Sequence, residues 1–272
     1  MKPYHAHPLA LVRSVLENSD LIWQMSKREV IGRYRGSFMG LLWSFVHPLF
    51  MLAVFTFVFS VVFRVRWGVA VESKSEFAVV LFAGLIVHSF FSECITRAPW
   101  LILGNVNYVK KVVFPLEVLA CVTVVGALFH IAVSAVVLVI FYSLLTMSFH
   151  ATAFLFPVVL LPFVLLTLGA TWFIASLSVY LRDVAQLVGI VSTALLFLSP
   201  ILYPISAVPE QYRHFIYLSP LTFVINQGRD VLLWGHMPDW PGLGAYYAVS
   251  AFVAWAGFFW FQKTRRGFAD VL

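Results

Sequence analysis

Long apolar stretches without any charged residue divide the chain into candidate helices. From Met39 to Phe63, and again from Val118 to Leu181, no Asp, Glu, Lys or Arg occurs. The hydrocarbon core of a bilayer is about 30 Å thick and needs about 20 mostly apolar residues per helix, so the second stretch is too long for one span. The polar sequence SFHAT (148–152) divides it into two. The pattern predicts six transmembrane helices, at about 40–63, 77–96, two within 118–181, 184–202 and 243–262.

Composition identifies the environment of these helices. The chain of 272 residues is 61% hydrophobic and 11% charged, whereas soluble domains carry about 25% charged residues. We therefore predict an all-α integral membrane protein with a single domain, in which 1–38 form a cytoplasmic tail and interfacial helix, 39–262 the six-span core and 263–272 a second cytoplasmic tail. Cys94 and Cys121 have neither a disulfide framework nor metal-ligand spacing, so no metal site is expected.

Lys and Arg are distributed unevenly between the predicted connections. The side that holds both termini carries 13 of the 18 Lys and Arg residues. Cytoplasmic loops of membrane proteins carry an excess of these residues, so both termini are predicted to be cytoplasmic. Just before the first span, residues 20–37 are predicted to form a helix on the membrane surface, with Trp23, Val30 and Tyr34 on one side.

Two connections are longer and more apolar than ordinary solvated loops. On the cytoplasmic side, residues 97–116 (RAPWLILGNVNYVKKVVFPL) contain a Gly-Asn-x-Asn turn signal and a Lys pair, which favours a short helix pressed against another surface over a plain loop. On the outer side, residues 203–242 contain FIYLSPLTFVINQ, which is too short to span a bilayer, and prolines interrupt the segment. It is predicted to form short re-entrant or interfacial helices, and a loop lying on the outer leaflet is the alternative.

The sequence does not contain the residue patterns of common enzymes. There is no Gly-x-x-x-x-Gly-Lys-[Ser/Thr] phosphate loop, no His-Glu-x-x-His and no Gly-x-Ser-x-Gly. Glu93, Glu117 and Asp183 lie near the predicted cytoplasmic ends of spans, where snorkelling or local pairing, as in the adjacent Arg182 and Asp183, explains them better than the midplane sites of ion-coupled carriers. Three histidines fall inside spans and are expected to hydrogen-bond neighbouring helices rather than bind metal: His47, His88 and His130.

Five stretches carry a family resemblance. They are KREVIGRYRGSFMGLLWSFVHPL (27–49), GNVNYVKKVVFPLEVL (104–119), SVYLRDVAQLVGIVSTALLFLSPILYP (178–204), SPLTFVINQGRDVLLWG (219–235) and FQKTRRGFADVL (261–272). With them the chain resembles, over nearly its whole length, the transmembrane subunits of ABC-2-type transporters that export O-antigen, capsular polysaccharide or teichoic acid. The likeness to O-antigen export permeases is the closest. One departure is His47-Pro48, where many relatives have Asn-Pro.

The resemblance implies a homodimer of six-span subunits with two separate cytoplasmic ABC ATPase subunits. ATP and Mg²⁺ would then bind to the ATPase, and this chain would need no cofactor and would not be an enzyme. An N-terminal interface helix, a cytoplasmic coupling helix and short outer gate helices are also implied. The residues expected to couple to the ATPase are Trp100, Leu101, Leu103, Asn105, Asn107, Lys110 and Lys111. The residues expected at the outer gate are Tyr212, Phe215, Tyr217 and Phe223.

The implied substrate is a polysaccharide linked to undecaprenyl diphosphate, O-antigen above all, which crosses the bacterial cytoplasmic membrane. Membrane lipids would be further partners, and nucleic acid would not. Arg33 and Arg35 are the expected contacts of the diphosphate, and ordinary anchoring of a basic flank in the cytoplasm is the competing explanation. An ion-coupled carrier or lipid flippase without an ATPase partner is the main alternative function, and a membrane-embedded transferase is a third.

Overall fold

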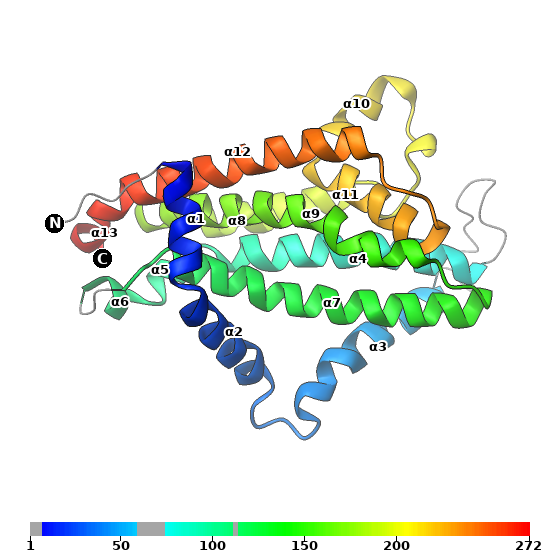
Figure 1. The fold of residues 1–272 in the computed structure, drawn as a ribbon, viewed down its shortest axis with the longest axis horizontal. Coiled ribbons are helices and arrows are strands. Elements are labelled where there is room, and N and C mark those ends of the chain that lie inside the picture. The colour runs from blue at the N-terminus through cyan, green and yellow to red at the C-terminus, as the bar shows by residue number, and fades with distance from the viewer. Residues whose placement is uncertain (1–6, 59–73, 111–113) are drawn as a thin grey trace.

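The computed structural model describes residues 7–58, 74–110 and 114–272, with the side chains of 74–76 left undescribed. The described residues form helices joined by short connections, and no strand occurs among them. The predicted all-α fold class is therefore confirmed. Figure 1 shows the long helices side by side along the bundle: α4 (Lys74–Arg97), α7 (Val118–Thr146), α8 (Phe156–Tyr180) and α12 (Trp240–Thr264).

Shorter elements connect the long helices and cover their ends. The N-terminal part contains α1 (Pro8–Glu17), α2 (Ser19–Tyr34), η1 (Gly40–Leu42) and α3 (Trp43–Phe57). The middle contains α5 (Trp100–Leu103), α6 (Val106–Lys110), η3 (Ala151–Leu155) and α9 (Val184–Phe197). After α9 come η4 (Ile205–Ala207), α10 (Glu210–Leu218), α11 (Pro220–Arg229) and the π-helical η5 (Asp230–Trp234), and after α12 come η6 (Arg265–Gly267) and α13 (Phe268–Val271).

Within the described ranges, five helical stretches are long and apolar enough to cross a membrane: Gly40–Phe57, Phe77–Arg97, Val118–Thr146, Ala151–Tyr180 and Trp240–Val271. They correspond to five of the six predicted spans, although 59–63 of the first lie outside the described residues. The predicted division between the third and fourth spans is confirmed, because α7 ends at Thr146 and the next residue, Met147, has a left-handed φ of 53°.

The fifth predicted span, 184–202, is only partly helical. Its helix α9 has 14 residues and ends at Phe197, so it extends about 21 Å, less than the hydrocarbon core of about 30 Å. Pro200 follows shortly afterwards and cannot donate a backbone hydrogen bond to continue the helix. The count of six spans therefore stays a prediction.

Two glycines bring α8 and α12 into backbone contact. A Cβ atom on Gly257 of α12 would lie 2.1 Å from the carbonyl oxygen of Gly169 in α8, and one on Gly169 would lie 2.4 Å from the carbonyl oxygen of Val253. Real Cβ atoms do not approach oxygen atoms so closely, so neither position accepts a side chain without a shift of the helices. Small residues at such crossings are typical of helix pairs in membranes, where close packing replaces the hydrophobic effect as the source of association.

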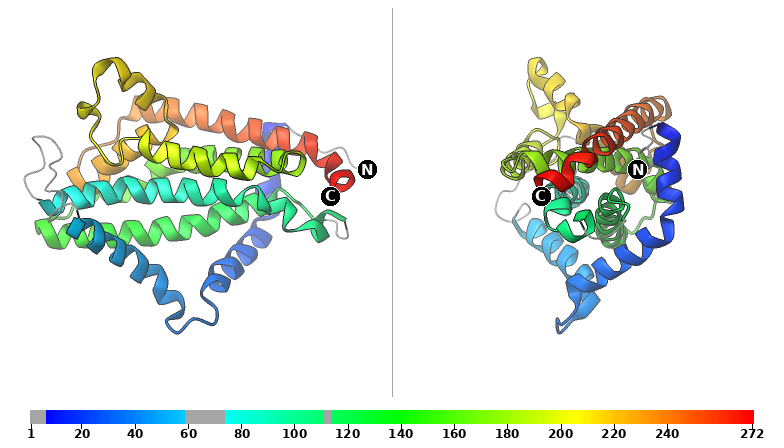
Figure 2. Two further views of the ribbon diagram at one scale, coloured as in Figure 1. Left: turned by 180° about the vertical axis from the view of Figure 1, so that it is seen from behind. Right: turned by 90° about the vertical axis from the view of Figure 1, so that its left-hand side faces the viewer.

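Helix α2 and the first span form a V on one side of the bundle. Figures 1 and 2 show α2 and α3 diverging from a turn at 35–39. Gly36 (φ 85°) and Gly40 (φ 53°) have left-handed backbones there, which glycine adopts without steric cost. The predicted helix at 20–37 is confirmed as α2, which buries Ile22 and Ser26. Helix α1, which the hydrophobic pattern did not predict, precedes it.

One end of the bundle gathers segments that are far apart in the sequence. Figure 1 shows α1, α5, α6 and α13 at this end, and the connection between α7 and α8 at the opposite end. This grouping is the one expected from the distribution of Lys and Arg. The side of the membrane that each end faces, and the single-domain boundaries at 38 and 262, remain predictions.

Candidate functional site

Four charged side chains join α2 to α4. Arg33 of α2 forms an ion pair with Glu93 of α4, and its Nη2 lies 3.2 Å from Oε1 of Glu29 on its own helix. Nη1 of Arg97, at the end of α4, lies 2.5 Å from Oε1 of Glu29 and 3.4 Å from Oε1 of Glu93. Burial acts to lower the pKa of Arg33, but the carboxylates of Glu93 and Glu29 raise it above its ordinary value. Two cations and two anions thus neutralise one another in this α2–α4 charge cluster.

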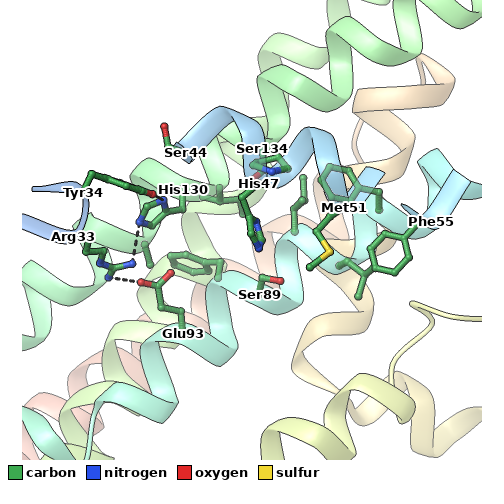
Figure 3. Close-up of a pocket in the computed structure, with 17 residues that line it drawn as sticks. Arg33, Tyr34, Ser44, His47, Met51, Phe55, Ser89, Glu93, His130 and Ser134 are labelled. Atoms are coloured by element: carbon green, nitrogen blue, oxygen red, sulfur yellow. Dashed lines mark hydrogen bonds and ion pairs between the residues drawn. The ribbon is translucent and has the colours of Figure 1, made fainter. Parts of the chain in front are cut away.

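Helix α7 completes the surroundings of the cluster. Nε2 of His130 is 2.9 Å from Nη1 of Arg33, and its Nδ1 is 3.4 Å from the hydroxyl of Tyr34. Figure 3 shows His130 and Glu93 on either side of the Arg33 guanidinium. One turn before His130, Gly126 faces the cluster, and a Cβ there would lie 3.5 Å from Oε1 of Glu29. The absence of a side chain at 126 lets α2 approach α7 with its charged residues between them.

A cavity of about 360 Å³ lies beside the cluster, enclosed by α2, α3, α4 and α7. We call it the α3–α4 cavity. Figure 3 shows the charged cluster at one side of it, Met51 and Phe55 at the other, and His47 and Ser89 between them. Its volume falls within the range of small-molecule sites, about 300–1,000 Å³. The cavity is thus polar at the α2 end and apolar along α3.

The two arginines expected to contact a diphosphate lie on different surfaces. Arg33 is at the wall of the α3–α4 cavity and is paired within the charge cluster. Arg35 is exposed and lines a shallow groove on another face of α2, together with Lys27 and Arg28. A diphosphate bound by both arginines at once does not fit this arrangement. Contact of a diphosphate with Arg33 or with Arg35 alone stays a prediction. Arg35 is better suited to bind an anion, because Lys27 and Arg28 line the same groove.

The apolar part of the expected coupling segment is less exposed than its sequence suggested. It forms the single helical turn α5, in which Ile102 is fully buried and Leu101 packs partly against the same hydrophobic cluster. Leu103 is half-buried, and Trp100 alone of the four side chains is largely exposed, at 61%. One face of this turn packs on the hydrophobic cluster, and Ile102 on that face attaches the turn to the core. The turn presents Trp100 outward.

The polar residues of the coupling segment shape a turn and an exposed end. The Nδ2 of Asn105 donates to the carbonyl oxygen of Leu101 at 3.0 Å and so closes the turn between α5 and α6. Asn107 and Lys110 are exposed on α6, and Lys111 lies outside the described residues. The predicted short helical structure of this connection is confirmed. Docking on an ATPase stays a prediction.

The start of α7 is tied to the C-terminal segment beside this surface. Nη1 of Arg265 lies 2.7 Å from Oε2 of Glu117, and both side chains are 11% exposed. Ser14 of α1 donates to the other oxygen of Glu117 at 3.0 Å, and Nε1 of Trp172 donates to its backbone carbonyl at 3.0 Å. Nη2 of Arg265 donates to the carbonyl oxygen of Phe114 at 2.6 Å. These bonds hold four separate segments around the end of the connection that contains α5 and α6.

The expectation of local partners is confirmed for most of the polar residues within spans. Glu93 and Glu117 are both in ion pairs, and Nε2 of His88 is 3.0 Å from the carbonyl oxygen of Ser192 on α9. Among the described residues, however, the expectation is wrong for His47, which has no hydrogen-bond partner, and Arg182 and Asp183 form no ion pair with each other. They lie in the turn between α8 and α9 and are exposed to solvent, which makes pairing unnecessary.

The predicted pair of short helices in the outer connection is present as α10 and α11. Ser219 separates them and accepts a hydrogen bond from the backbone N–H of Leu221 at the start of α11, as a helix-capping residue does. The expected gate residues Tyr212, Phe215 and Tyr217 are exposed on α10. Phe223 is half-buried on α11 and packs against Tyr246 of α12, with 5.1 Å between the ring centroids. Their entry into the outer leaflet and their gate function stay predictions.

A buried arginine holds these helices against the bundle. Arg229, at the end of α11, is 1% exposed. It donates to the carbonyl oxygens of Val80 on α4 at 3.0 Å, of Pro200 at 2.6 Å and of Ile201 at 3.2 Å. A Cβ atom on Gly84 of α4 would lie 2.9 Å from Nη2 of Arg229, so the absence of a side chain at position 84 leaves space for the guanidinium. The non-helical chain after α9 is therefore fixed to α4 through α11.

Comparison with known proteins identifies the family. The sequence model of the ABC-2 type transporter family matches residues 20–233. The chain belongs to this family. An O-antigen export system permease protein of Myxococcus xanthus is 29% identical over 270 residues, which are 96% of this chain and 99% of that protein. One of Klebsiella pneumoniae is 25% identical over 93% of this chain and 95% of its own length. A polysialic acid transport protein of Escherichia coli is 23% identical over 78% and 81%.

The matched region of this ABC-2 transporter chain includes the cluster, the cavity and both short-helix segments. Reasoning from the sequence names Arg33, Glu93 and His130 separately, but it does not single out Glu29 and Arg97 and does not predict that these five side chains meet. A spacing of four residues between acid and base recurs at Glu29–Arg33 and Glu93–Arg97 and was the available sign, but helical spacing does not show that two such pairs meet. Within the described ranges, no group of three or more His, Cys, Asp or Glu side chains could hold a metal ion.

Proposed function

We propose that this chain is the permease subunit of an ATP-driven exporter of polysaccharide linked to undecaprenyl diphosphate, O-antigen above all. Two copies form the path across the bacterial cytoplasmic membrane, with both termini in the cytoplasm. Two copies of a separate ATPase subunit bind ATP and Mg²⁺ and carry out hydrolysis, so the chain itself acts in transport and not as an enzyme.

The extent of the similarity to O-antigen export permeases carries this proposal. It reaches 96% of this chain and 99% of the Myxococcus xanthus protein, so the similarity extends over nearly the whole sequence rather than over one segment. The Escherichia coli relative is described as a transporter of polysialic acid, which is a different polysaccharide. The class of substrate is therefore better supported than the particular polymer.

The geometry at the α5–α6 end supports coupling to a partner. Trp100 is exposed next to the fully buried Ile102, so an outward aromatic side chain stands on a turn that is attached to the core. Tryptophan in such a position is a frequent hot spot of protein interfaces. The turn follows α4 directly, and α4 ends in the charge cluster at Arg97. Movement of a docked ATPase would therefore reach α4 and α2 together.

The location of the acidic residues favours an ATP-driven exporter over an ion-coupled carrier. Glu93 pairs with Arg33 near the end of α4, and Glu117 pairs with Arg265 at the start of α7. Ion-coupled carriers place such groups near the bilayer midplane, where they bind and release the coupling ion. Carboxylates held in ion pairs at helix ends are poorly suited to that cycle.

Reconstitution of export in a deletion strain tests the proposal. A strain that lacks this gene should lose surface polysaccharide and accumulate the lipid-linked polymer inside, and the tagged chain should restore export and copurify with an ATPase. An ATPase variant with its phosphate-loop lysine replaced should abolish export with the chain present at normal abundance. Export that continues with this variant and stops when the proton gradient is dissipated would instead identify an ion-coupled carrier.

A further inference from the structure

The α3–α4 cavity interrupts an otherwise enclosed helix. From Phe77 to Phe91, α4 is buried or half-buried at every position except Ser89, which is exposed. Ser89 and the half-buried Leu85 one turn earlier both line the cavity. A helix packed on several sides exposes a polar residue here because the cavity, and not a neighbouring side chain, lies in front of it.

Three polar side chains of the cavity are available to a ligand. Within the described part of the chain, His47, Ser89 and Ser134 have no hydrogen-bond partner, although all three line the cavity. Serines within helices commonly donate to the carbonyl oxygen one turn earlier, as Ser178 does to Ile174 at 2.7 Å. The hydroxyls of Ser89 and Ser134 make no such bond and, with the imidazole of His47, can both donate and accept.

The electrostatics of the cavity favour a neutral ligand. Arg33 is the one arginine among the described residues that line the cavity, and it is paired with Glu93 and Glu29 and contacts His130. An anion such as a phosphate would have to compete with these carboxylates for the guanidinium, and a buried charge without a partner is costly. Neutral groups that carry several hydroxyls face no such competition.

The apolar part of the wall fits a flat or extended apolar surface. On α3, His47, Met51 and Phe55 recur every four residues and so share one side of the helix. Phe82 and Phe90 line the cavity from α4. Aromatic side chains with a few placed polar groups are typical of sites that hold ligands with both apolar faces and hydroxyls.

We propose that the α3–α4 cavity binds one neutral sugar ring through His47, Ser89 and Ser134. The hydroxyls of the ring exchange hydrogen bonds with these side chains, and its apolar face packs against the aromatic rings of α3 and α4. Under the proposed function, on which this assignment rests, the exported glycan supplies the ring, while its diphosphate stays outside the neutralised charge cluster.

Photolabelling of the purified full-length chain in phosphatidylcholine nanodiscs tests this site. The probe is an octyl β-glucoside with a diazirine on the alkyl chain, and an octyl phosphate with the same diazirine is the anionic comparison. The glucoside should label peptides within 44–55 and 127–134 about tenfold more than the phosphate, since one hydrogen-bonding difference corresponds to about a tenfold change in affinity. Equal labelling by both probes would indicate partition of the alkyl chain alone and would overturn the proposal, as would preferential labelling by the phosphate.

Variants of one helix separate the site from the general fold. Ser134→Leu fills the cavity and should reduce glucoside labelling about tenfold, whereas Ser143→Leu on the same helix, outside the cavity, should leave it unchanged. Ser134→Ala and His47→Leu provide milder changes if Ser134→Leu lowers membrane abundance. Unchanged labelling in Ser134→Ala and His47→Leu together would overturn the assignment. The assignment would also be overturned if the variants that lose labelling are only those that size exclusion shows to be poorly folded.

Export measured in the deletion strain distinguishes this proposal from the function on which it rests. If the wild-type chain restores export but the glucoside does not label the cavity, the sugar site is wrong and the export function stands. If the wild-type chain does not restore polysaccharide export, the proposed function is wrong whatever the cavity binds.

Discussion

Arg97 and Glu29 join the helix that leads into the coupling segment to the helix that precedes the first span. Nη1 of Arg97 lies 2.5 Å from Oε1 of Glu29, and Arg97 stands three positions before Trp100. Because α5 follows α4 almost directly, a force applied at Trp100 reaches α2 through this ion pair. The predicted interface helix and the predicted coupling segment are thus parts of one connected structure at the same end of the bundle.

Charge exchange tests the connection between Arg97 and Glu29. Arg97→Glu places three acids together and should lower stability and export, and the double variant Glu29→Arg/Arg97→Glu should recover part of both. Contacting residues show coupling energies of about 0.5–3 kcal/mol in such cycles. Thermal unfolding in detergent measures the cycle. The exposed pair Arg13–Glu17 is the control, because exposed ion pairs contribute about 0–1 kcal/mol to stability. If the effects of the single changes at Glu29 and Arg97 are additive in the double variant, the two residues are not directly coupled.

Replacement of Trp100 tests docking of the ATPase. Trp100→Ala should weaken copurification about thirtyfold, since loss of an interface hot spot costs about 2 kcal/mol or more, while membrane abundance stays normal. Trp240→Ala is the matched control, because Trp240 is similarly exposed, at 53%, at the start of α12. Leu101→Asp is a less specific change, because Leu101 also packs against the core. Full copurification of Trp100→Ala would remove α5 from the interface.

The close crossing of α8 and α12 at their glycines leads to a prediction about stability. Gly257→Ala introduces a Cβ that would meet the carbonyl oxygen of Gly169 at 2.1 Å, and overpacking of this kind costs about 1–3 kcal/mol. Gly244→Ala on the same helix has no atom within 4 Å of its Cβ and should be neutral. Thermal unfolding in detergent compares the two variants. Equal melting temperatures would show that the helices separate without cost.

The buried arginine of α11 allows a test of the outer helices. Arg229→Met removes the bonds to the carbonyl oxygens of Val80, Pro200 and Ile201, and each hydrogen bond to a charged group contributes about 1.5–3 kcal/mol. We expect a large fall in thermal stability and faster labelling of a cysteine introduced at Ile216, which is buried in the wild type. Arg213→Met on α10 should have a smaller effect. Unchanged protection of position 216 would show that α10 does not depend on Arg229.

Reporter fusions test the sidedness derived from Lys and Arg. A fusion at Asn105, in the α5–α6 segment, and one at the C-terminus should report the cytoplasm, since both lie at the same end of the bundle (Figure 1). A fusion at Gln211, in α10, should report the outside. A cytoplasmic result at Gln211 would overturn the assignment of the last two spans, which is also where the short α9 leaves the span count undecided.

The class of fold and most of the helices follow from the amino-acid sequence alone. Spans in a bilayer need long runs of apolar residues, so their positions follow from local composition without knowledge of any contact. The same holds for the helical turns at 100–110 and 210–229, which are marked by apolar segments too short to span. The end of α9 was misjudged because apolar residues continue to Leu202, while Pro200 and the bonds from Arg229 hold that stretch in a non-helical path.

Which side chains meet depends on how the helices pack in three dimensions. Glu29 and Glu93 are 64 positions apart in the sequence, and each has a basic residue four positions later that could have been its sole partner. The packing of α2 against α7 brings both pairs within reach of each other and commits Arg33 to carboxylates, whereas Arg35 stays exposed. In the same way, the packing of α5 buried Ile102 and exposed Trp100. Charge and hydrophobicity are properties of residues, but the partner of a charge depends on helix packing, which one-dimensional spacing does not contain.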